Sequence, residues 1–471
     1  MKNTLIKDGT IVNASETFQA DIMISQGIVA QIGRNLDQCG ASIIDASGCF
    51  VLPGGVDVHT HLNLTANGVK VSDRFFTGTA SAAFGGTTCI VEHPGFGPRN
   101  CSLAHQVERY QEEARGQAVV DYGFHAVFQH VDEEVLNSLP QLAEQGVPTS
   151  KIYLTYDGRL NDHEIMRVLD RAGQQGLLAA FHAENHAIIS FLQEKFKAEG
   201  KLGPLFHALS RPDYCEAEAI RRVLYLAEAA GNVPVYIVHL STALGLRAIE
   251  EGRLRGLTVY AEVCPQHLLL DDSCYLEPEH QGLKYIMAPP ARKKEDCAEL
   301  WHGLKTGAID VVATDHCSFN FADKLALGKN DFSKCPGGIP GVETRLSLIY
   351  SEGVLKKKLT LNRFVEVVST APAKIMGLYP LKGALAPGSD ADIVVFDPYH
   401  EKTVTPDNLF HNADYSPYDG MILRGWPKVT LVRGRVVMED NRLVAEKGWG
   451  RYIPRRLGQE SESARKSHDD E

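Results

Sequence analysis

Imidazole and carboxylate side chains close several short apolar runs in this sequence. His59 and His61 close the first run, and residues i and i+2 of a strand share one face, so both rings can reach one ion. His182, His239 and Asp315 close three later runs. A single histidine is more often a hydrogen-bonded structural residue. Several histidines and an acid, each closing a different predicted strand, instead favour a divalent metal site, and this ligand mixture suits zinc.

Lys151 lies inside another apolar run, residues 149–156, with the sequence TSKIYLTY. An ammonium is costly to bury there and has no lone pair to offer a metal. Two interpretations stay open from the residues alone. The lysine either extends its charged end into solvent, or it reacts with carbon dioxide to give an anionic carbamate that can bridge two metal ions.

Other histidines near these runs could compete for a place in the site. We interpret them as structural residues or as supports for the metal ligands. They are His93, His125, His186, His267 and His316.

Eight short apolar or β-branched runs alternate with amphipathic stretches through the middle of the chain. The runs cover residues 51–62, 87–96, 119–128, 150–156, 177–185, 235–242, 257–264 and 311–318. Helices are expected between them, for example over residues 103–115, 163–175 and 216–230. This order predicts a (β/α)₈ barrel, in which the C-terminal strand ends meet at one face. A doubly wound sheet is the alternative, but no glycine-rich nucleotide loop follows the first strand.

Both ends of the chain have the pattern of short strands. Turn pairs Asp8-Gly9 and Gln26-Gly27 separate apolar segments at the start, and Arg433-Gly434 separates two more near the end. We therefore expect one small β-sandwich domain built from residues 1–50 and 374–457. The barrel should occupy residues 51–373, and residues 458–471 should form a polar, mobile tail.

Composition and charge narrow the possible partners and location of the 471-residue chain. Hydrophobic residues make up 44% and charged residues 23%, as in a folded soluble protein. The net charge of −11 and the absence of a basic block disfavour nucleic acid or an anionic membrane as a partner. The N-terminus lacks a signal-peptide core, and no apolar run reaches the ~18 residues of a membrane span. Ten scattered cysteines without a CxxC pair fit free thiols, so we expect a cytoplasmic protein.

Three motifs resemble those of the cyclic amidohydrolase superfamily. They are PGGVDVHTH at residues 53–61, KGALAPGSDAD at residues 382–392 and ADYSPY at residues 413–418. Lys151, His182, His239 and Asp315 also fall where that superfamily keeps its other ligands. The resemblance covers nearly the whole chain. It is closest to the D-hydantoinase and dihydropyrimidinase family, in particular its bacterial D-phenylhydantoinase branch.

The resemblance implies a binuclear zinc centre and assigns its ligands. His59 and His61 would bind one ion and His182 and His239 the other. Lys151, carboxylated on its side-chain nitrogen, would bridge the two ions. Asp315 would bind the first ion and carry a proton from the attacking water to the leaving nitrogen.

Three further positions carry over for substrate binding. Tyr156 would donate its hydroxyl to the developing oxyanion. The backbones of Ala288 (in IMAPP, residues 286–290) and Gly337 (in CPGG, residues 335–338) would contact the ring amide. The family usually has serine and asparagine at these two positions, but the backbone makes the contact, so these departures need not abolish binding.

The resemblance also separates the branches of the superfamily. Dihydroorotases carry an arginine two residues after the second histidine, where this chain has Asn63. The expected reaction is therefore hydrolysis of 5-substituted hydantoins to N-carbamoyl amino acids. Dihydropyrimidinase and allantoinase activity are the alternatives. A non-catalytic role, like that of the dihydropyrimidinase-related neuronal proteins, is disfavoured because the full ligand set is present.

Substrate choice and assembly are expected to follow the same family. The loop at residues 62–68 and Tyr153 would flank the substituent at ring carbon five, with Leu64 and Tyr153 packing an aromatic group of a D-hydantoin. The alternative is that Tyr153 packs inside the barrel and the loop is only a lid. Relatives are usually homotetramers, and residues 412–420 resemble their C-terminal contact region, so we expect a homotetramer.

Overall fold

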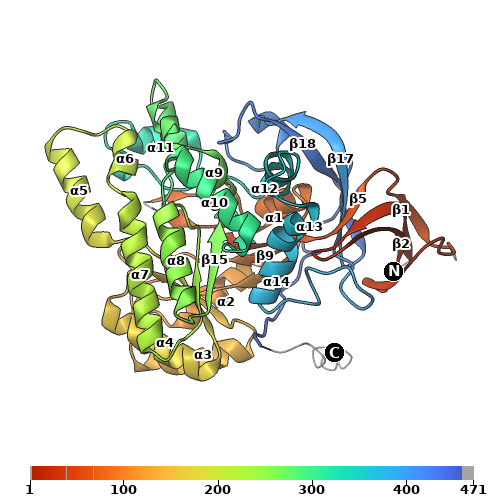
Figure 1. Cartoon of the computed structure of the whole chain (residues 1–471), viewed down its shortest axis with the longest axis horizontal. Helices are drawn as coiled ribbons and strands as arrows, with labels where there is room; N and C mark the ends of the chain where they lie inside the picture. The colour runs from red at the N-terminus through yellow and green to blue at the C-terminus, as the bar shows by residue number, and fades with distance from the viewer. Residues whose placement is uncertain (1–2, 39, 67, 459–471) are drawn as a thin grey trace.

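The computed structural model describes residues 3–38, 40–66 and 68–458. A helix-covered barrel lies beside a smaller sheet that contains strands from both ends of the chain (Figure 1). Apart from its first residue, the predicted tail at residues 458–471 lies outside the described residues.

Parallel strands form the barrel in the predicted order. They are β6 (Gly55–Thr60), β9 (Thr87–Glu92), β10 (Asp121–Phe124), β11 (Ala126–Val127), β12 (Thr149–Tyr153), β13 (Leu178–His182), β14 (Val235–Ile237), β15 (Val259–Val263) and β16 (Val311–Val312). The segments β10 and β11 are one strand interrupted at His125, so each predicted apolar run supplies one barrel strand. A parallel bridge between Thr60 and His316 closes the ring.

Helices connect the strands and cover the barrel from outside (Figure 1). They are α1 (Phe75–Phe84), α2 (Leu103–Ala114), α3 (Glu133–Glu144), α4 (Asp162–Gln175), α5 (His186–Ala198), α6 (Leu205–Leu209), α7 (Asp213–Ala229), α8 (Ala243–Leu254), α9 (Pro265–Leu269), α10 (Lys294–Thr306), α11 (Phe321–Gly328), α12 (Arg345–Ile349), α13 (Leu361–Val365) and α14 (Ala371–Ile375). The three helices expected from amphipathic spacing are present as α2, α4 and α7.

Helix α4 shows how the sequence sets these elements. The Asn161 side chain accepts a hydrogen bond from the Glu164 backbone, and the Glu164 carboxylate accepts one from the Asn161 backbone, which satisfies two free N–H groups at the helix start. Gly176 ends the helix with a φ of 64°. Between these caps, Ile165 and Leu169 are buried against the barrel, as their spacing predicts.

The smaller sheet joins both chain ends in the strand order β20-β19-β18-β17-β5-β1-β2-β3, with β4 beside β1. Its strands are β1 (Thr4–Val12), β2 (Thr17–Ser25), β3 (Ile28–Gly33), β4 (Ser42–Asp45), β5 (Phe50–Pro53), β17 (Ile393–Thr403), β18 (Ile422–Val432), β19 (Arg435–Glu439) and β20 (Arg442–Leu443). The predicted fold class, a (β/α)₈ barrel with a small β part from both ends, is confirmed. The domain boundaries at residues 50 and 373 stay a prediction.

One turn prediction at the N-terminus is wrong. Asp8 and Gly9 do not separate two strands but lie within β1, where the register against β2 shifts. Asp8 has a φ of 60°, so the extra residue is accommodated as a bulge in a continuous strand. The pairs Gln26-Gly27 and Arg433-Gly434 do form the expected turns, between β2 and β3 and between β18 and β19.

A buried ionic cluster joins the barrel to the smaller sheet. The Lys382 ammonium lies 2.5 Å from Asp121, 2.9 Å from Asp390 and 2.8 Å from Asp392. Arg433 also pairs with Asp121. The three carboxylates are close enough together to hold a metal ion, but the ammonium already occupies the space between them.

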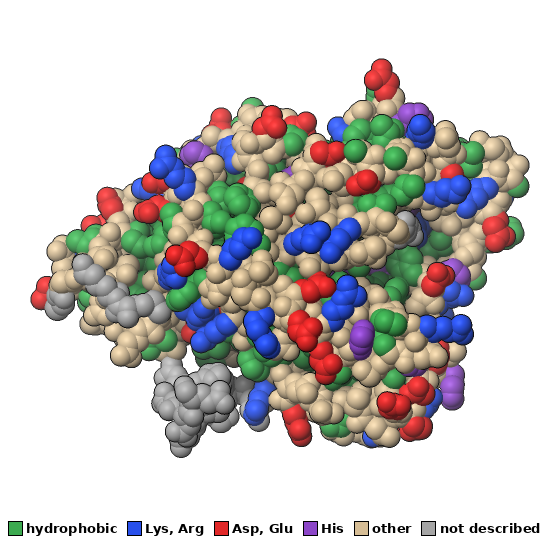
Figure 2. Space-filling model, turned by 180° about the vertical axis from the view of Figure 1, so that it is seen from behind, with side chains coloured by type: hydrophobic (Ala, Val, Ile, Leu, Met, Phe, Trp, Pro, Cys, Tyr) green, Lys and Arg blue, Asp and Glu red, His purple; other side chains and the backbone are tan. Residues whose placement is uncertain are grey.

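The surface charges, the helix lengths and the cysteines can be compared with what the composition predicts. Basic and acidic side chains are intermixed over the face drawn in Figure 2. Within the described ranges, no helix is long and apolar enough to cross a membrane. The cysteines that the structure describes are free.

Candidate active site

A cavity of about 540 Å³ opens at the C-terminal ends of the barrel strands. Every site residue predicted from the sequence lines it. These are His59, His61, Leu64, Lys151, Tyr153, Tyr156, His182, His239, Ala288, Asp315 and Gly337.

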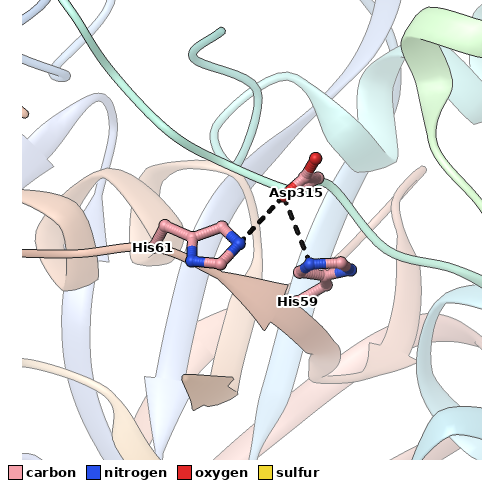
Figure 3. A group of neighbouring side chains, drawn as sticks. All are labelled: His59, His61 and Asp315. Atoms are coloured by element: carbon pink, nitrogen blue, oxygen red, sulfur yellow. Dashed lines mark ion pairs between the residues drawn. The ribbon is translucent and has the colours of Figure 1, made fainter. Parts of the chain in front are cut away.

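His59, His61 and Asp315 converge at one side of this cavity (Figure 3). Oδ1 of Asp315 lies 3.2 Å from Nε2 of His59 and 3.1 Å from Nε2 of His61. His59 lies in β6 and His61 directly after it, which places both rings on one side as the i, i+2 spacing predicts. Asp315 lies in the loop after β16 with a φ of 53°, a backbone conformation that turns its carboxylate toward the two histidines.

Lys151 lies in the middle of β12, fully buried, and points into the same space. Its Nζ is 3.4 Å from Nε2 of His59. Burial lowers the pKa of this amine to about 8, although the Asp315 and Glu262 carboxylates act in the opposite direction. The structure therefore excludes the solvent-extended interpretation of this lysine.

His182 and His239 face each other across the other side of the cavity. Nδ1 of His182 lies 2.9 Å from Nε2 of His239. His182 ends β13, and its Nε2 lies 2.8 Å from the Glu184 carboxylate. His239 follows β14 with a φ of 37°, so its ring is aimed by the loop rather than by the strand.

Glu262, in β15, supports both histidine groups and was missed in the sequence analysis. Its Oε1 accepts from Nδ1 of His59 at 2.7 Å and from the backbone N–H of His239 at 3.0 Å. Its Oε2 accepts from the Tyr236 hydroxyl at 2.9 Å. Burial raises the pKa of this carboxyl group to about 8, although the charge of Lys151 and the hydrogen bonds from His239 and Tyr236 act in the opposite direction. Glu262 thus fixes the tautomer and orientation of His59.

Glu262→Gln is expected to weaken metal binding without unfolding the protein. Carboxylates behind metal-binding histidines typically contribute 10–100-fold in metal affinity, so the metal Kd should rise by about that factor. Metal titration followed by elemental analysis measures it. Glu343→Gln is the matched control, because Glu343 is also buried but accepts from Ser81 and Phe410 away from the cavity. Equal metal affinity in both variants would contradict this support role.

The ring nitrogens show why a cation fits this site. His59 donates from Nδ1 to Glu262, and His61 directs Nδ1 at the carbonyl oxygen of His93, 3.1 Å away. With its proton on Nδ1, a neutral ring presents an Nε2 lone pair to the Asp315 carboxylate, and that contact is repulsive unless a cation lies between the two groups. Protonating His59 is disfavoured because burial, and next the charge of Lys151, hold its pKa well below the usual range. Imidazole with carboxylate is a ligand set for zinc and related divalent ions.

Aromatic and apolar side chains form another wall of the cavity. The Tyr153 ring lies edge-on to Phe96, with ring centroids 5.2 Å apart, and to Tyr156 at 5.8 Å. Leu64 and Ile189 also line the cavity. Phe96 was not expected here from the sequence. Asn63 lies outside the cavity wall, and its side chain contacts Glu113 and the backbone of Phe75 instead.

The other histidines have several different surroundings. The His93 ring stacks on that of His125, with centroids 4.0 Å apart, and is tilted against that of His59 at 4.2 Å. Neither of its ring nitrogens has a hydrogen-bond partner among the described residues. His316 pairs with Asp73 at 3.2 Å, and His267 contacts the carbonyl oxygen of Pro289. His186 lines the cavity. His93 and His186 therefore lie closer to the site than their sequence positions indicated.

A (β/α)₈ barrel whose strand ends carry convergent histidines, an acid and a buried lysine defines the class of metal-dependent hydrolases built on this fold.

Comparison with known proteins identifies the family. The Amidohydrolase family model matches residues 50–437. D-phenylhydantoinase of Escherichia coli O9:H4 (strain HS) is 47% identical over 453 residues, which cover 96% of this chain and 98% of that protein. Dihydropyrimidinase from Brevibacillus agri superposes with a TM-score of 0.95 at 40% identity, over 97% of this chain and 100% of that one. D-hydantoinase from Bacillus sp. AR9 superposes with a TM-score of 0.95 at 41% identity, also over 97% of this chain and 100% of that one. The chain belongs to the Amidohydrolase family and is a metal-dependent cyclic amidohydrolase.

Proposed function

We propose that this protein hydrolyses the cyclic amide bond of 5-substituted hydantoins, with D-configured aromatic ones preferred, and releases N-carbamoyl amino acids. The observation that carries the proposal is the convergence of the buried Lys151 with four histidines and Asp315 beside an aromatic wall. The similarity to D-phenylhydantoinase over nearly the whole chain supports the same reaction.

The site residues would hold two divalent metal ions, which we propose to be zinc. His59, His61 and Asp315 would hold one ion, and His182 and His239 the other. Lys151 would join them after its neutral amine attacks carbon dioxide, which forms an N–C bond, releases one proton and leaves an anionic carbamate. When bound, the ions lower the pKa of a water molecule and polarise the amide carbonyl.

The protein side chains would move the proton and stabilise charge. The Asp315 carboxylate accepts the proton of the attacking water and returns it to the ring nitrogen as the C–N bond breaks. The Tyr156 hydroxyl donates a hydrogen bond to the carbonyl oxygen as it becomes negative. Ala288 and Gly337 line the cavity, and their backbone groups would contact the ring amide.

The pocket would accept a large substituent at ring carbon five. Leu64, Phe96 and Tyr153 offer apolar surface next to the metal-binding side. A side chain at Gly337 would meet only the Cα atom of Met287, at 3.9 Å, so the glycine leaves open space where the family usually has asparagine. Arg211 also lines the cavity, and its charge is neutralised by Glu184.

D-5-phenylhydantoin is expected to have a kcat/KM at least tenfold above that of dihydrouracil. Burying a phenyl ring is worth a few kcal/mol at roughly 25 cal/mol per Å², enough for such a preference. Steady-state kinetics on the purified enzyme with both phenylhydantoin enantiomers and dihydrouracil measures it. Leu64→Ala should reduce the preference while changing dihydrouracil turnover little. Faster turnover of dihydrouracil would assign the protein as a dihydropyrimidinase, and turnover of allantoin alone as an allantoinase.

The homotetramer and the cytoplasmic location remain part of the proposal. The homotetramer rests on the family resemblance, and the location rests on the scattered cysteines without a CxxC pair. The predicted contact segment at residues 412–420 packs largely within its own chain. Tyr418 is buried, and the Tyr415 hydroxyl donates to the carbonyl oxygen of Lys284.

A further inference from the structure

Glu184 and Arg211 form a buried ion pair beside the metal-binding histidines. Glu184 follows β13 and is fully buried. Arg211 lies between α6 and α7, is 6% exposed, and donates to Oε2 of Glu184 through its terminal N–H. The same Oε2 lies 2.8 Å from Nε2 of His182. Removing two charges from water is costly, and such a pair is often no more stable than an apolar one. Its position at the cavity therefore points to a role in the site.

Arg211 also contacts Tyr156. Its guanidinium carbon lies 5.9 Å from the centre of the Tyr156 ring, which is a cation–π contact. Both residues line the cavity. Arg292 donates to the backbone carbonyl of Arg211 and to the Ser241 hydroxyl, which fixes the segment that carries the guanidinium.

Tyr156 needs such a partner because its own strand does not hold it. Strand β12 ends at Tyr153, and Tyr156 has a φ of 71°, in the left-handed region that non-glycine residues rarely adopt. It is also 37% exposed. The position of its hydroxyl is therefore set by contacts from other parts of the fold.

We propose that Arg211 is a positioning residue that holds the Tyr156 hydroxyl toward the substrate carbonyl, and that Glu184 couples this tyrosine to His182. The inference rests on the proposed function, in which Tyr156 stabilises the oxyanion. A guanidinium has no acceptor, so the Tyr156 hydroxyl cannot donate its proton to Arg211, whose charge lies against the tyrosine ring. The phenolic proton is then free to point into the cavity, and the nearby positive charge makes that O–H a stronger donor.

A double-mutant cycle tests this coupling. Tyr156→Phe is expected to lower kcat by about 10²-fold, as loss of one oxyanion donor does, and Arg211→Met by about 10-fold or more with little change in KM. Because Arg211 acts through the tyrosine, the double variant should have a kcat within about threefold of Tyr156→Phe alone. Arg211→Lys should restore part of the loss only when Tyr156 is present.

Controls separate this role from general stabilisation. Arg253→Met removes another arginine that pairs with a carboxylate, Asp310, at 2.7 Å and outside the cavity lining, so its kcat should stay near wild type. Metal content is measured for every variant, and Arg211→Lys replaces Arg211→Met in the cycle if the methionine variant does not fold.

Two results would overturn the inference. Multiplicative losses in the double variant would show that Arg211 acts independently of Tyr156, and a raised KM that persists without Tyr156 would make Arg211 a direct substrate ligand. Failure of the proposed function would look different, since Tyr156→Phe would then keep wild-type turnover of hydantoins or no ring ureide would be hydrolysed.

Discussion

Lys151→Ala is expected to lose detectable hydantoin hydrolysis and most of the bound metal. The amine lies fully buried, 3.4 Å from Nε2 of His59, where a carbamate would supply an anionic bridge between the two histidine groups. Elemental analysis and steady-state kinetics measure both losses. Short carboxylic acids, or carbon dioxide with a small amine, should restore part of the turnover by replacing the bridge.

Lys324 provides the matched control. It is also fully buried, burial likewise lowers its pKa to about 8, and its ammonium donates to the carbonyl oxygen of Ile286 at 2.7 Å instead of reaching the histidines. Lys324→Met should therefore keep its metal even if it melts earlier. Two metal ions and full activity in Lys151→Ala would refute the bridging role. Isotope-labelled carbon dioxide should give a carbamate carbon signal in wild type and in Lys324→Met, and none in Lys151→Ala.

Asp315→Asn is expected to lower kcat by about 10²–10⁴-fold, because the amide can neither take up nor return the proton. KM should change less than kcat, since the aromatic wall is untouched. Turnover is compared at equal metal content, with circular dichroism to confirm the fold, because Asp315 also faces His59 and His61.

Asp310→Asn is the control for this substitution. Asp310 directly precedes β16, pairs with Arg253 and does not line the cavity. Its replacement should affect stability more than turnover. A loss below about tenfold in a metal-loaded Asp315→Asn enzyme would move the proton transfer to another group.

The barrel and its histidines could be predicted because both follow from local patterns. Each apolar run became a strand, and His59, His61 and His182 lie at strand ends where alternation alone sets their direction. The directions of His239 and Asp315 could not be derived in this way, because both lie in loops with positive φ.

The supporting groups were missed because they act across long sequence separations. Glu262 contacts His59 from a strand more than two hundred residues away, so no spacing rule connects them. A signal was nevertheless present, since Glu262 is a lone acid in the apolar run 257–264 and a buried carboxylate needs partners. Arg211 carried no comparable signal, because it follows a short helix and lies in no regular pattern of apolar residues. The turn predicted at Asp8-Gly9 was wrong because turns and bulges use the same residue types.

The order of the smaller sheet has a consequence for how the chain is made. Strand β5 pairs with β1 on one side and with β17 on the other, and the whole barrel separates β5 from β17 in sequence. At about 5–20 residues per second, tens of seconds pass between synthesis of these two strands. Throughout that time β5 has a free edge, which is a template for pairing with other chains. An incomplete chain that is released before β17 is made would therefore be prone to aggregate through its first strands, even though its barrel strands have already been made.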